Sequence, residues 1–357
     1  MSKLRFGIIG AGNGGQTMAA ILASKGYSAK LMDIKKDLVD AINARGKITL
    51  DGKIELEAMP ELVTTDPVEA IKDTDFILVV ATADAHEEIA KAIAKHVTAN
   101  QMILLVPGMF GGTLAFKSAL KTYGCPYDVE VAETADLPYG CRTREPGHIF
   151  HSGLKSHVKL AAVPASNTQK FIDLLKPIFP NLFAATDIWE FAMGNNCILH
   201  CIPMVMNVNK MDLDQTFDYY MEGITPSIAK IAEKVDEERV AVAKAFGLLD
   251  ETCEQWVKTT YNVNAEGLYN VVQHTESYGG IKSPSSLAHR FCAEDTFGSL
   301  APIASIAKEL GIPTPGMDAI LFLIGAATGI DYSKEGRTAE KMGLKGKSVE
   351  EMYAMVR

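Results

Sequence analysis

The sequence predicts two domains, an α/β domain with a doubly wound parallel sheet followed by an all-α domain. Strand and helix patterns alternate through the first half of the 357-residue chain, which is typical of a parallel sheet with helices on both faces. After Asp187 the pattern changes to helical segments, without a strand pattern of similar quality. We therefore expect domains over residues 1–186 and 187–357, and this length allows each domain its own hydrophobic core.

The first domain is predicted from short apolar runs separated by amphipathic segments. Arg5–Ile9 and Ser28–Met32 are expected strands, with a helix between them over Gln16–Lys25. Residues 75–82 and 101–106 are continuous apolar runs, as expected for parallel strands buried on both faces. Further helices are expected over residues 36–44 and 86–96, and further strands over 129–133, 157–163 and 182–186.

The second domain is predicted from apolar residues at helical spacing. Trp189–Asn209 is a long, apolar and periodic segment that predicts one long helix. Further helices are expected over residues 214–221, 226–247, 251–259, 265–273, 299–310, 315–328 and 335–342.

Composition excludes several classes of protein. Hydrophobic residues at 47% and charged residues at 22% are ordinary for a globular protein. The net charge of −9 argues against nucleic acid or an anionic membrane as a partner. The longest apolar run, Ala319–Ile330, is too short for a membrane span. Six cysteines without a Cys-x-x-Cys spacing indicate reduced thiols in the cytoplasm.

A glycine-rich turn follows the first predicted strand directly. Residues 10–15 read Gly-Ala-Gly-Asn-Gly-Gly, the pattern G-x-G-x-x-G between a strand and a helix that binds dinucleotides. Gly10 permits a tight turn, Gly12 lets the backbone approach the pyrophosphate, and Gly15 lets helix and strand pack closely. The helix N-terminus adds unpaired N–H groups for the phosphates. The residues expected to contact the cofactor here are Gly10, Gly12, Asn13, Gly14 and Gly15.

Asp33 ends the second predicted strand, at the distance from the turn that is typical of a ribose-binding acid. Its carboxylate can accept both ribose hydroxyls and repels a 2′-phosphate, which favours NAD over NADP. Lys35 and Lys36 follow closely and soften that preference, so NADP is not excluded. Thr82 and Pro107 follow the next two strands, at the sheet edge where open α/β sheets bind ligands, and are expected to contact the cofactor.

Polar side chains also stand out in the helical half. His200 lies inside the long predicted helix, with Asn196 one turn earlier on the same face. Arg290 and Asp295 lie on one later segment. Histidine titrates near neutral pH and is suited to proton transfer, but in an apolar helix it is more often a buried structural residue. The residues by themselves leave both interpretations of His200 open.

A metal site is conceivable on the same helix. Cys197, His200 and Cys201 share one face at spacings of three and four residues. Side chains within one turn converge poorly on a tetrahedral ion. We therefore expect two small buried thiols beside the histidine and no metal.

Several stretches resemble the opine dehydrogenases of the octopine/nopaline type. Besides the glycine turn they are Pro107–Gly112, Cys141-Arg142, Asn196-x-x-x-His200, Tyr219–Ser227, Glu233–Asp236, Arg290–Asp295 and Gly336–Lys341. The resemblance runs from Gly10 to Gly343, nearly the whole chain. It implies a Rossmann-type first domain, a helical domain like that of 6-phosphogluconate dehydrogenase, and a homodimer built from the helical domain.

The resemblance also implies an activity and roles for the residues. Such enzymes use NADH to condense an α-keto acid, such as pyruvate, with the amino group of an amino acid through an imine, and they catalyse the reverse oxidation. A histidine and an aspartate form the catalytic pair and an arginine holds a substrate carboxylate. The matching positions are His200, Asp295 and Arg290. Asn196 is expected to form a hydrogen bond with the substrate or the nicotinamide.

Two other classes of function remain open. Keto-acid or hydroxy-acid reductases of the ketopantoate-reductase or glycerol-3-phosphate-dehydrogenase type share the two-domain build, but they carry a lysine where this chain has His200. A non-catalytic NAD-sensing protein would not need His200, Arg290 and Asp295 together. Residues 136–140 and 201–202 depart from the family pattern near the expected site, which leaves the amino-acid substrate open.

Overall fold

The computed structural model describes residues 3–249 and 251–357. Its contacts define two compact units, the first running to Phe191 and including Tyr353–Arg357, the second covering Ala192–Met352. The structural boundary thus lies after Phe191 rather than after residue 186, and the last five residues return to the first unit. The backbone N–H of Ala165 donates to Val356 O at 2.6 Å, which ties this C-terminal segment to the first unit.

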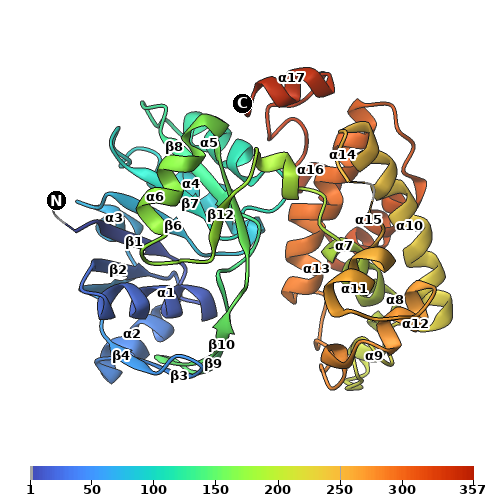
Figure 1. The fold of residues 1–357 in the computed structure, drawn as a ribbon, viewed down its shortest axis with the longest axis horizontal. Coiled ribbons are helices and arrows are strands. Elements are labelled where there is room, and N and C mark those ends of the chain that lie inside the picture. The colour runs from blue at the N-terminus through green and yellow to red at the C-terminus, as the bar shows by residue number, and fades with distance from the viewer. Residues whose placement is uncertain (1–2, 250) are drawn as a thin grey trace. The chain divides into compact units, whose positions relative to one another are not determined.

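The first unit is built on an eight-stranded sheet with the order β12-β11-β8-β7-β6-β1-β2-β5 (Figure 1). Its strands are β1 (Arg5–Ile9), β2 (Ser28–Met32), β5 (Leu62–Thr64), β6 (Phe76–Val79), β7 (Met102–Leu105), β8 (Glu130–Thr134), β11 (Val158–Val163) and β12 (Leu182–Ala184). The strands from β5 to β8 in this order are parallel, which confirms the predicted doubly wound sheet. At one edge β11 runs antiparallel to β8 and parallel to β12.

Helices cover both faces of this sheet, and alternate residues of each strand therefore enter two different cores. In β1, Phe6 and Ile8 belong to one buried cluster and Ile9 to the other. Burial on both faces explains why β6 and β7 are uninterrupted apolar runs. The helices are α1 (Asn13–Ser24), α2 (Lys36–Arg45), α3 (Pro67–Ile71), α4 (His86–Ile93), α5 (Gly112–Thr122) and α6 (Thr168–Leu175), with 3₁₀ turns at Ala83–Ala85, Ala165–Asn167 and Ile188–Phe191.

A second, four-stranded sheet was not predicted from the sequence. Its order is β4-β3-β10-β9, formed by β3 (Ile48–Gly52), β4 (Leu56–Ala58), β9 (Tyr139–Glu145) and β10 (His148–Leu154). β9 and β10 are antiparallel neighbours, whereas β10 pairs in parallel with β3, about a hundred residues earlier in the chain. Such a long-range pairing leaves no local signal in the sequence.

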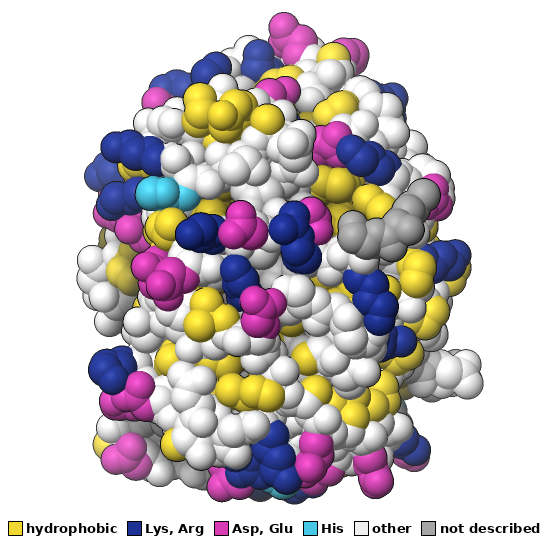
Figure 2. All heavy atoms as spheres, turned by 90° about the vertical axis from the view of Figure 1, so that its left-hand side faces the viewer, with side chains coloured by type: hydrophobic (Ala, Val, Ile, Leu, Met, Phe, Trp, Pro, Cys, Tyr) yellow, Lys and Arg dark blue, Asp and Glu magenta, His cyan; other side chains and the backbone are white. Residues whose placement is uncertain are grey.

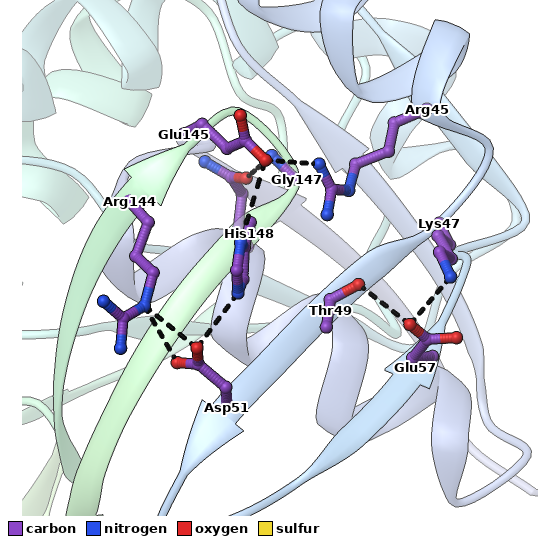
Figure 3. Close-up of polar contacts among 10 residues, drawn as sticks. Arg45, Lys47, Thr49, Asp51, Glu57, Arg144, Glu145, Gly147 and His148 are labelled. Carbon is purple, nitrogen blue, oxygen red and sulfur yellow. Dashed lines mark hydrogen bonds and ion pairs between the residues drawn. The ribbon is translucent and has the colours of Figure 1, made fainter.

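Charged side chains connect the strands of the second sheet on its exposed face (Figure 3). Asp51 accepts from His148 at 3.1 Å and pairs with Arg144, while Glu145 in β9 pairs at 2.7 Å with Arg45 at the end of α2. These charges interrupt the apolar pattern of β9 and β10, which is why the strands were missed. Elsewhere on the surface shown in Figure 2, basic and acidic side chains also lie interspersed.

The second unit is helical, as predicted, and within its described residues strand pairing is limited to one isolated bridge between Asp218 and Lys282. Its helices are α7 (Asn196–Leu199), α8 (Cys201–Met206), α9 (Val208–Asp212), α10 (Pro226–Ala245), α11 (Cys253–Tyr261), α12 (Leu268–Gln273), α13 (Arg290–Asp295), α14 (Ala301–Glu309), α15 (Pro315–Thr328) and α16 (Tyr332–Glu335), and α17 (Val349–Ala354) ends the chain. None of the helices in the described ranges has both the length and the apolar character needed to cross a membrane.

The prediction of one long helix over Trp189–Asn209 is wrong. The segment is divided into a 3₁₀ turn and the short helices α7, α8 and α9, with His200 at the junction of α7 and α8. Pro203 explains that junction, because proline has no N–H to donate to the carbonyl four residues earlier and its ring crowds that carbonyl. The carbonyl concerned is that of Leu199, directly before His200.

Two further predicted helices are also wrong. Residues 214–221 form turns, in which Asp218 accepts hydrogen bonds from the backbone N–H groups of Met221 and Gly280. Such side-chain bonds to the backbone compete with helix formation. The helix expected over 335–342 is replaced by α16, which ends at Glu335, and turns that follow it.

Candidate active site

The glycine turn between β1 and α1 has the geometry that the sequence motif predicts. Gly10 has a φ of +103°, and a Cβ there would lie 2.3 Å from the carbonyl oxygen of Val80 in the loop after β6. A Cβ on Gly15 would lie 1.7 Å from Gly10 O, so only glycine allows this approach of helix and strand. A Cβ on Gly12 would meet nothing within 4 Å. The backbone at Gly12 thus borders open space, which lets a ligand approach it.

Asp33 lies at the end of β2 beside this turn. Its Oδ2 accepts from the N–H of Ala11 at 2.8 Å and its Oδ1 from the N–H of Lys35 at 3.0 Å. These two bonds fix the orientation of a carboxylate that is still partly exposed. Each carboxylate oxygen has a further lone pair for a hydroxyl donor, so Asp33 fits the ribose of a dinucleotide.

Thr82 and Pro107 lie just beyond the carboxyl ends of β6 and β7, which are adjacent parallel strands. Thr82 precedes the 3₁₀ turn Ala83–Ala85, and both Thr82 and Pro107 are half-buried. The structure thus gathers these two residues and the glycine turn at one edge of the sheet, where open α/β sheets bind ligands.

The second sheet holds the start of α1 in place. The hydroxyl of Tyr139 donates to Gly14 O at 2.8 Å, and Thr143 donates to Asn13 Oδ1 through its hydroxyl at 2.6 Å. The N–H of Gly147 donates to Gln16 Oε1 at 2.8 Å. The side chain of Asn13 is therefore engaged with β9, and its backbone N–H is the part that remains suited to a phosphate.

Glu133 in β8 is a buried carboxylate that sequence reasoning missed. Its Oε2 accepts from the backbone N–H of Thr113 at 2.5 Å and from the Thr113 hydroxyl at 2.8 Å, at the start of α5. A Cβ on Gly108 would lie 2.4 Å from Glu133 Cβ, so the loop after β7 packs directly against this acid. The signal that could have indicated it was a glutamate directly after the apolar pair Val131-Ala132 of the predicted strand.

In the second unit His200 and Asp295 are in direct contact. His200 Nδ1 lies 2.6 Å from Asp295 Oδ2, and both residues are at least nine-tenths buried. A carboxylate accepts, so Nδ1 carries the proton, and in the neutral ring Nε2 is the acceptor. Asp295 therefore fixes the tautomer of His200 and stabilises its cationic form, as an aspartate does in a catalytic triad.

Tyr220 contacts the other ring nitrogen, which was not predicted. Its hydroxyl lies 3.0 Å from His200 Nε2. Phe291 stacks on the imidazole with the ring centroids 3.9 Å apart and the planes 8° from parallel. The imidazole is thus held at both nitrogens and on one face. Tyr220 belongs to the turn segment that the sequence assigned to a helix, which hid its position.

A π-helical turn follows Asp295. The residues Arg290–Glu309 run through α13, the π segment Thr296–Leu300 and α14 without a break in helical backbone. Such π turns inside α-helices are frequent at functional sites. A π turn has more residues than an α turn, so the side chains after Asp295 point in other directions than they would in a regular α-helix.

Arg290 begins α13 and keeps its charge exposed. Its side chain is 63% exposed, its Nη1 lies 3.9 Å from Glu294 Oε2, and its guanidinium lies 5.5 Å from the centre of the Phe291 ring. Phe291 therefore contacts both Arg290 and His200. An exposed guanidinium offers a planar fork to a carboxylate, as the sequence predicts for Arg290. Asn196 is exposed at the start of α7, one turn before His200.

The cysteines beside His200 are buried and protonated. Burial raises the pKa of the Cys197 thiol to about 11 and that of the Cys201 thiol well above its usual value. The sulfur of Cys201 lies 3.4 Å from the Thr296 hydroxyl. Within residues 3–249 and 251–357, no group of His, Cys, Asp and Glu has the arrangement of a metal site. The two thiols therefore act as small packing groups.

The predicted site residues thus form two groups, one in each unit. The group in the first unit fits a dinucleotide, because it combines open space at Gly12, a helix N-terminus and the oriented carboxylate of Asp33. The group in the second unit combines a buried imidazole–carboxylate pair, which is suited to proton transfer, with an exposed guanidinium, which is suited to an anion. A reduced nicotinamide would supply a hydride when bound to the first unit.

Comparison with known proteins identifies the family of the chain. A family model described as the alpha-helical domain of NAD/NADP octopine/nopaline dehydrogenase matches residues 184–328. A model of the N-terminus of NAD-dependent glycerol-3-phosphate dehydrogenase matches residues 5–122. The opine dehydrogenase of Arthrobacter sp. (strain 1C) is 36% identical over 343 residues, which cover 96% of this chain and 95% of that protein. The D-nopaline dehydrogenase of Agrobacterium tumefaciens (strain T37) is 25% identical, over 95% of this chain and 89% of its own.

Solved structures share the fold along the whole chain. A structure of octopine dehydrogenase in complex with NADH and agmatine matches with a TM-score of 0.79 and 19% identity, over 98% of each chain. A ketopantoate reductase from Ralstonia eutropha JMP134 has a TM-score of 0.64 and 17% identity, over 93% of this chain and 99% of its own. The Arthrobacter relative covers nearly the full length at 36% identity, so the chain belongs to the opine dehydrogenase family of NAD(P)-dependent oxidoreductases.

Proposed function

We propose that the enzyme uses NADH to condense a pyruvate-like α-keto acid with the amino group of an amino acid, and that it oxidises the resulting secondary amine in reverse. The contact of 2.6 Å between His200 and Asp295 carries this proposal, because imine formation needs a group that takes and returns protons. A ketopantoate-type reductase uses a lysine at this position. The contact of His200 with Asp295 favours the condensation reaction over that alternative.

Each predicted residue has a defined task in this reaction. His200 stores the proton that the amino group of the substrate releases, and Asp295 stabilises the charged ring. Arg290 binds a substrate carboxylate through its exposed guanidinium. Asn196, exposed one turn before His200, donates a hydrogen bond to the substrate or the nicotinamide.

We propose NADH as the preferred cofactor. Asp33 is oriented by the N–H groups of Ala11 and Lys35, and its charge opposes a 2′-phosphate. Binding of the dinucleotide would involve the residues of the glycine turn, Thr82 and Pro107. The loop at Pro107 and Gly108 packs against the buried Glu133.

The test is an NADH oxidation assay with three mixtures. Pyruvate with pooled amino acids is expected to give oxidation, whereas pyruvate alone and buffer alone are not. Oxidation with pyruvate alone would instead support a keto-acid reductase. No oxidation with any mixture, despite NADH binding, would revive the non-catalytic alternative.

We propose that the enzyme is a homodimer that pairs through α15. The exposed face of this helix carries Phe322 at 73% exposure and Leu323 at 41%, and Ile330, also at 41%, lies just beyond the end of the helix. The opposite stripe, with Met317 and Ile324, is buried. The apolar part of this face follows Asp318, and such a patch can pair with a second copy of itself, which favours a homodimer. Phe322→Glu is expected to give a monomer in sedimentation velocity, and a wild-type monomer would contradict the proposal.

We also propose a cytoplasmic location. All six cysteines are free thiols, and four of them are buried. Such thiols suit a reducing compartment. Cell fractionation with an antibody against the native chain tests this, and recovery from a secreted fraction would contradict it.

A further inference from the structure

Both nitrogens of the His200 ring are engaged by neighbouring side chains. Nδ1 contacts Asp295 at 2.6 Å, and Nε2 contacts the Tyr220 hydroxyl at 3.0 Å. Neither ring nitrogen is therefore available for direct proton exchange with a substrate. Either Tyr220 moves away from Nε2, or Tyr220 itself passes the proton between Nε2 and the substrate.

The packing around Tyr220 opposes movement of its ring. Tyr220 stacks on Tyr278 with centroids 4.1 Å apart and planes 11° from parallel, and Tyr219 meets it edge-on at 4.9 Å. Tyr278 in turn contacts Tyr261 at 5.0 Å. Such aromatic contacts hold the Tyr220 ring in its present orientation. The hydroxyl therefore stays beside Nε2.

We propose that Tyr220 relays the proton between His200 Nε2 and the substrate. The proposal rests on the condensation reaction argued above, and it identifies the Tyr220 hydroxyl as the group that exchanges protons directly with the substrate. The phenol is suited to this, because a hydroxyl donates one hydrogen bond and accepts others. Burial raises the pKa of Tyr220 well above its usual value, so the hydroxyl stays protonated and passes protons without ionising.

The proton transfers balance over the condensation. The ammonium form of the amino acid first gives one proton to the Tyr220 oxygen, and the phenol proton moves to His200 Nε2. The free amine then adds to the keto carbonyl and forms a carbinolamine. In the next step Tyr220 donates its proton to the carbinolamine hydroxyl while Nε2–H reprotonates the phenol oxygen. The C–O bond breaks, water leaves with that electron pair, and the nitrogen lone pair forms the C=N bond.

The test compares Tyr220→Phe with Tyr219→Phe. The neighbouring Tyr219 hydroxyl donates to the carbonyls of His200 and Leu199 and not to the imidazole. It is therefore a matched control for loss of a buried hydroxyl beside the same histidine. Tyr220→Phe keeps the ring that stacks on Tyr278. Thermal unfolding and NADH binding are measured on both variants to confirm that they are folded.

For Tyr220→Phe we expect kcat to fall by about 10²- to 10⁴-fold, the range for a lost acid–base group. We also expect the solvent deuterium isotope effect on kcat to rise, because proton transfer becomes the slow step. Tyr219→Phe is expected to keep the wild-type isotope effect.

An unchanged kcat in Tyr220→Phe would overturn the relay. A fall in kcat without a rise in the isotope effect, or with the same rise in Tyr219→Phe, would also overturn it, since either result indicates a structural role. A wild-type enzyme that is inactive with every keto acid and amine mixture would overturn the condensation reaction and the relay together. An active wild type with an unaffected Tyr220→Phe would overturn the relay alone.

Discussion

The hydroxyl of Tyr219 lies 3.2 Å from the carbonyl oxygen of Leu199. Pro203 cannot donate to this carbonyl, so the tyrosine supplies the hydrogen bond that a continuous helix would have supplied. The same hydroxyl lies 3.0 Å from His200 O. The single hydroxyl proton is thus shared between two carbonyls, of which that of His200 also accepts from the N–H of Met204 at 3.0 Å, whereas that of Leu199 lacks its helical donor.

Replacement of Tyr219 by phenylalanine should destabilise the fold. The change leaves a buried carbonyl without a donor, which costs about 1–3 kcal/mol. The free energy of unfolding from urea titration measures this, with Tyr353→Phe, at a partly exposed residue near the C-terminus, as a comparison. Equal stability of Tyr219→Phe and wild type would show that water satisfies the Leu199 carbonyl.

Asp295→Asn should lower kcat strongly while NADH binding stays unchanged. The amide donates to Nδ1 where the carboxylate accepts, so it favours the wrong tautomer and no longer stabilises the cationic ring. The loss of turnover is expected to be about 10²- to 10⁴-fold, by analogy with the aspartate of serine proteases. Steady-state kinetics and NADH titration separate the two effects. If kcat survives, Asp295 does not orient the catalytic base.

Arg290→Lys should chiefly raise the KM of one substrate. Lysine keeps the charge but loses the planar fork and its second hydrogen bond to a carboxylate. A charge-assisted hydrogen bond contributes about 1.5–3 kcal/mol, so KM should rise about 10- to 100-fold. Measuring KM separately for the keto acid and the amino acid identifies the carboxylate that Arg290 binds. An unchanged KM for both would remove Arg290 from the site.

Asp33→Asn should shift the enzyme from NADH toward NADPH. The variant loses the charge that opposes a 2′-phosphate and weakens the bonds to the ribose hydroxyls. The ratio of kcat/KM for NADH to that for NADPH should fall about tenfold or more, since one lost charged hydrogen bond exceeds 1.4 kcal/mol. Asp37→Asn, in the first turn of α2, is the control and should leave the ratio unchanged. A similar fall in the control would indicate a general effect of surface charge.

The second sheet should lose part of its stability in acid. The hydrogen bond from Arg45 and then its charge lower the pKa of Glu145. A carboxyl group with a lowered folded-state pKa stabilises the fold above its unfolded pKa of about 4.3, and this contribution is lost as the pH falls further. The difference in Tm between wild type and Glu145→Gln should therefore be present at pH 7 and should shrink below about pH 4. A pH-independent difference would mean that packing, not charge, is lost in the variant.

Much of the cofactor site was predictable because its signals are local. The glycines at 10, 12 and 15 and the acid at 33 lie within one strand–helix–strand unit, so their spacing can be read from a short stretch of sequence. The buried strands were visible as apolar runs for a similar reason, since each is covered on both faces. The family resemblance added the roles of His200, Arg290 and Asp295, which local patterns by themselves left open.

The tertiary structure decided what depends on distant partners. The pairing of β10 with β3 joins segments about a hundred residues apart and exposes charged faces, so the pattern of alternating hydrophobicity did not reveal it. The contact of Tyr220 with His200 arises because residues 214–221 form turns instead of the expected helix. Helical periodicity predicted a continuous helix through His200. The helix is interrupted there because Pro203 has no N–H for the Leu199 carbonyl, and the Tyr219 hydroxyl bonds to that carbonyl instead. By itself, the sequence determined the nucleotide-binding turn and the layered sheet. The surroundings of the imidazole were decided by long-range packing, because both of its hydrogen-bonding partners come from other segments.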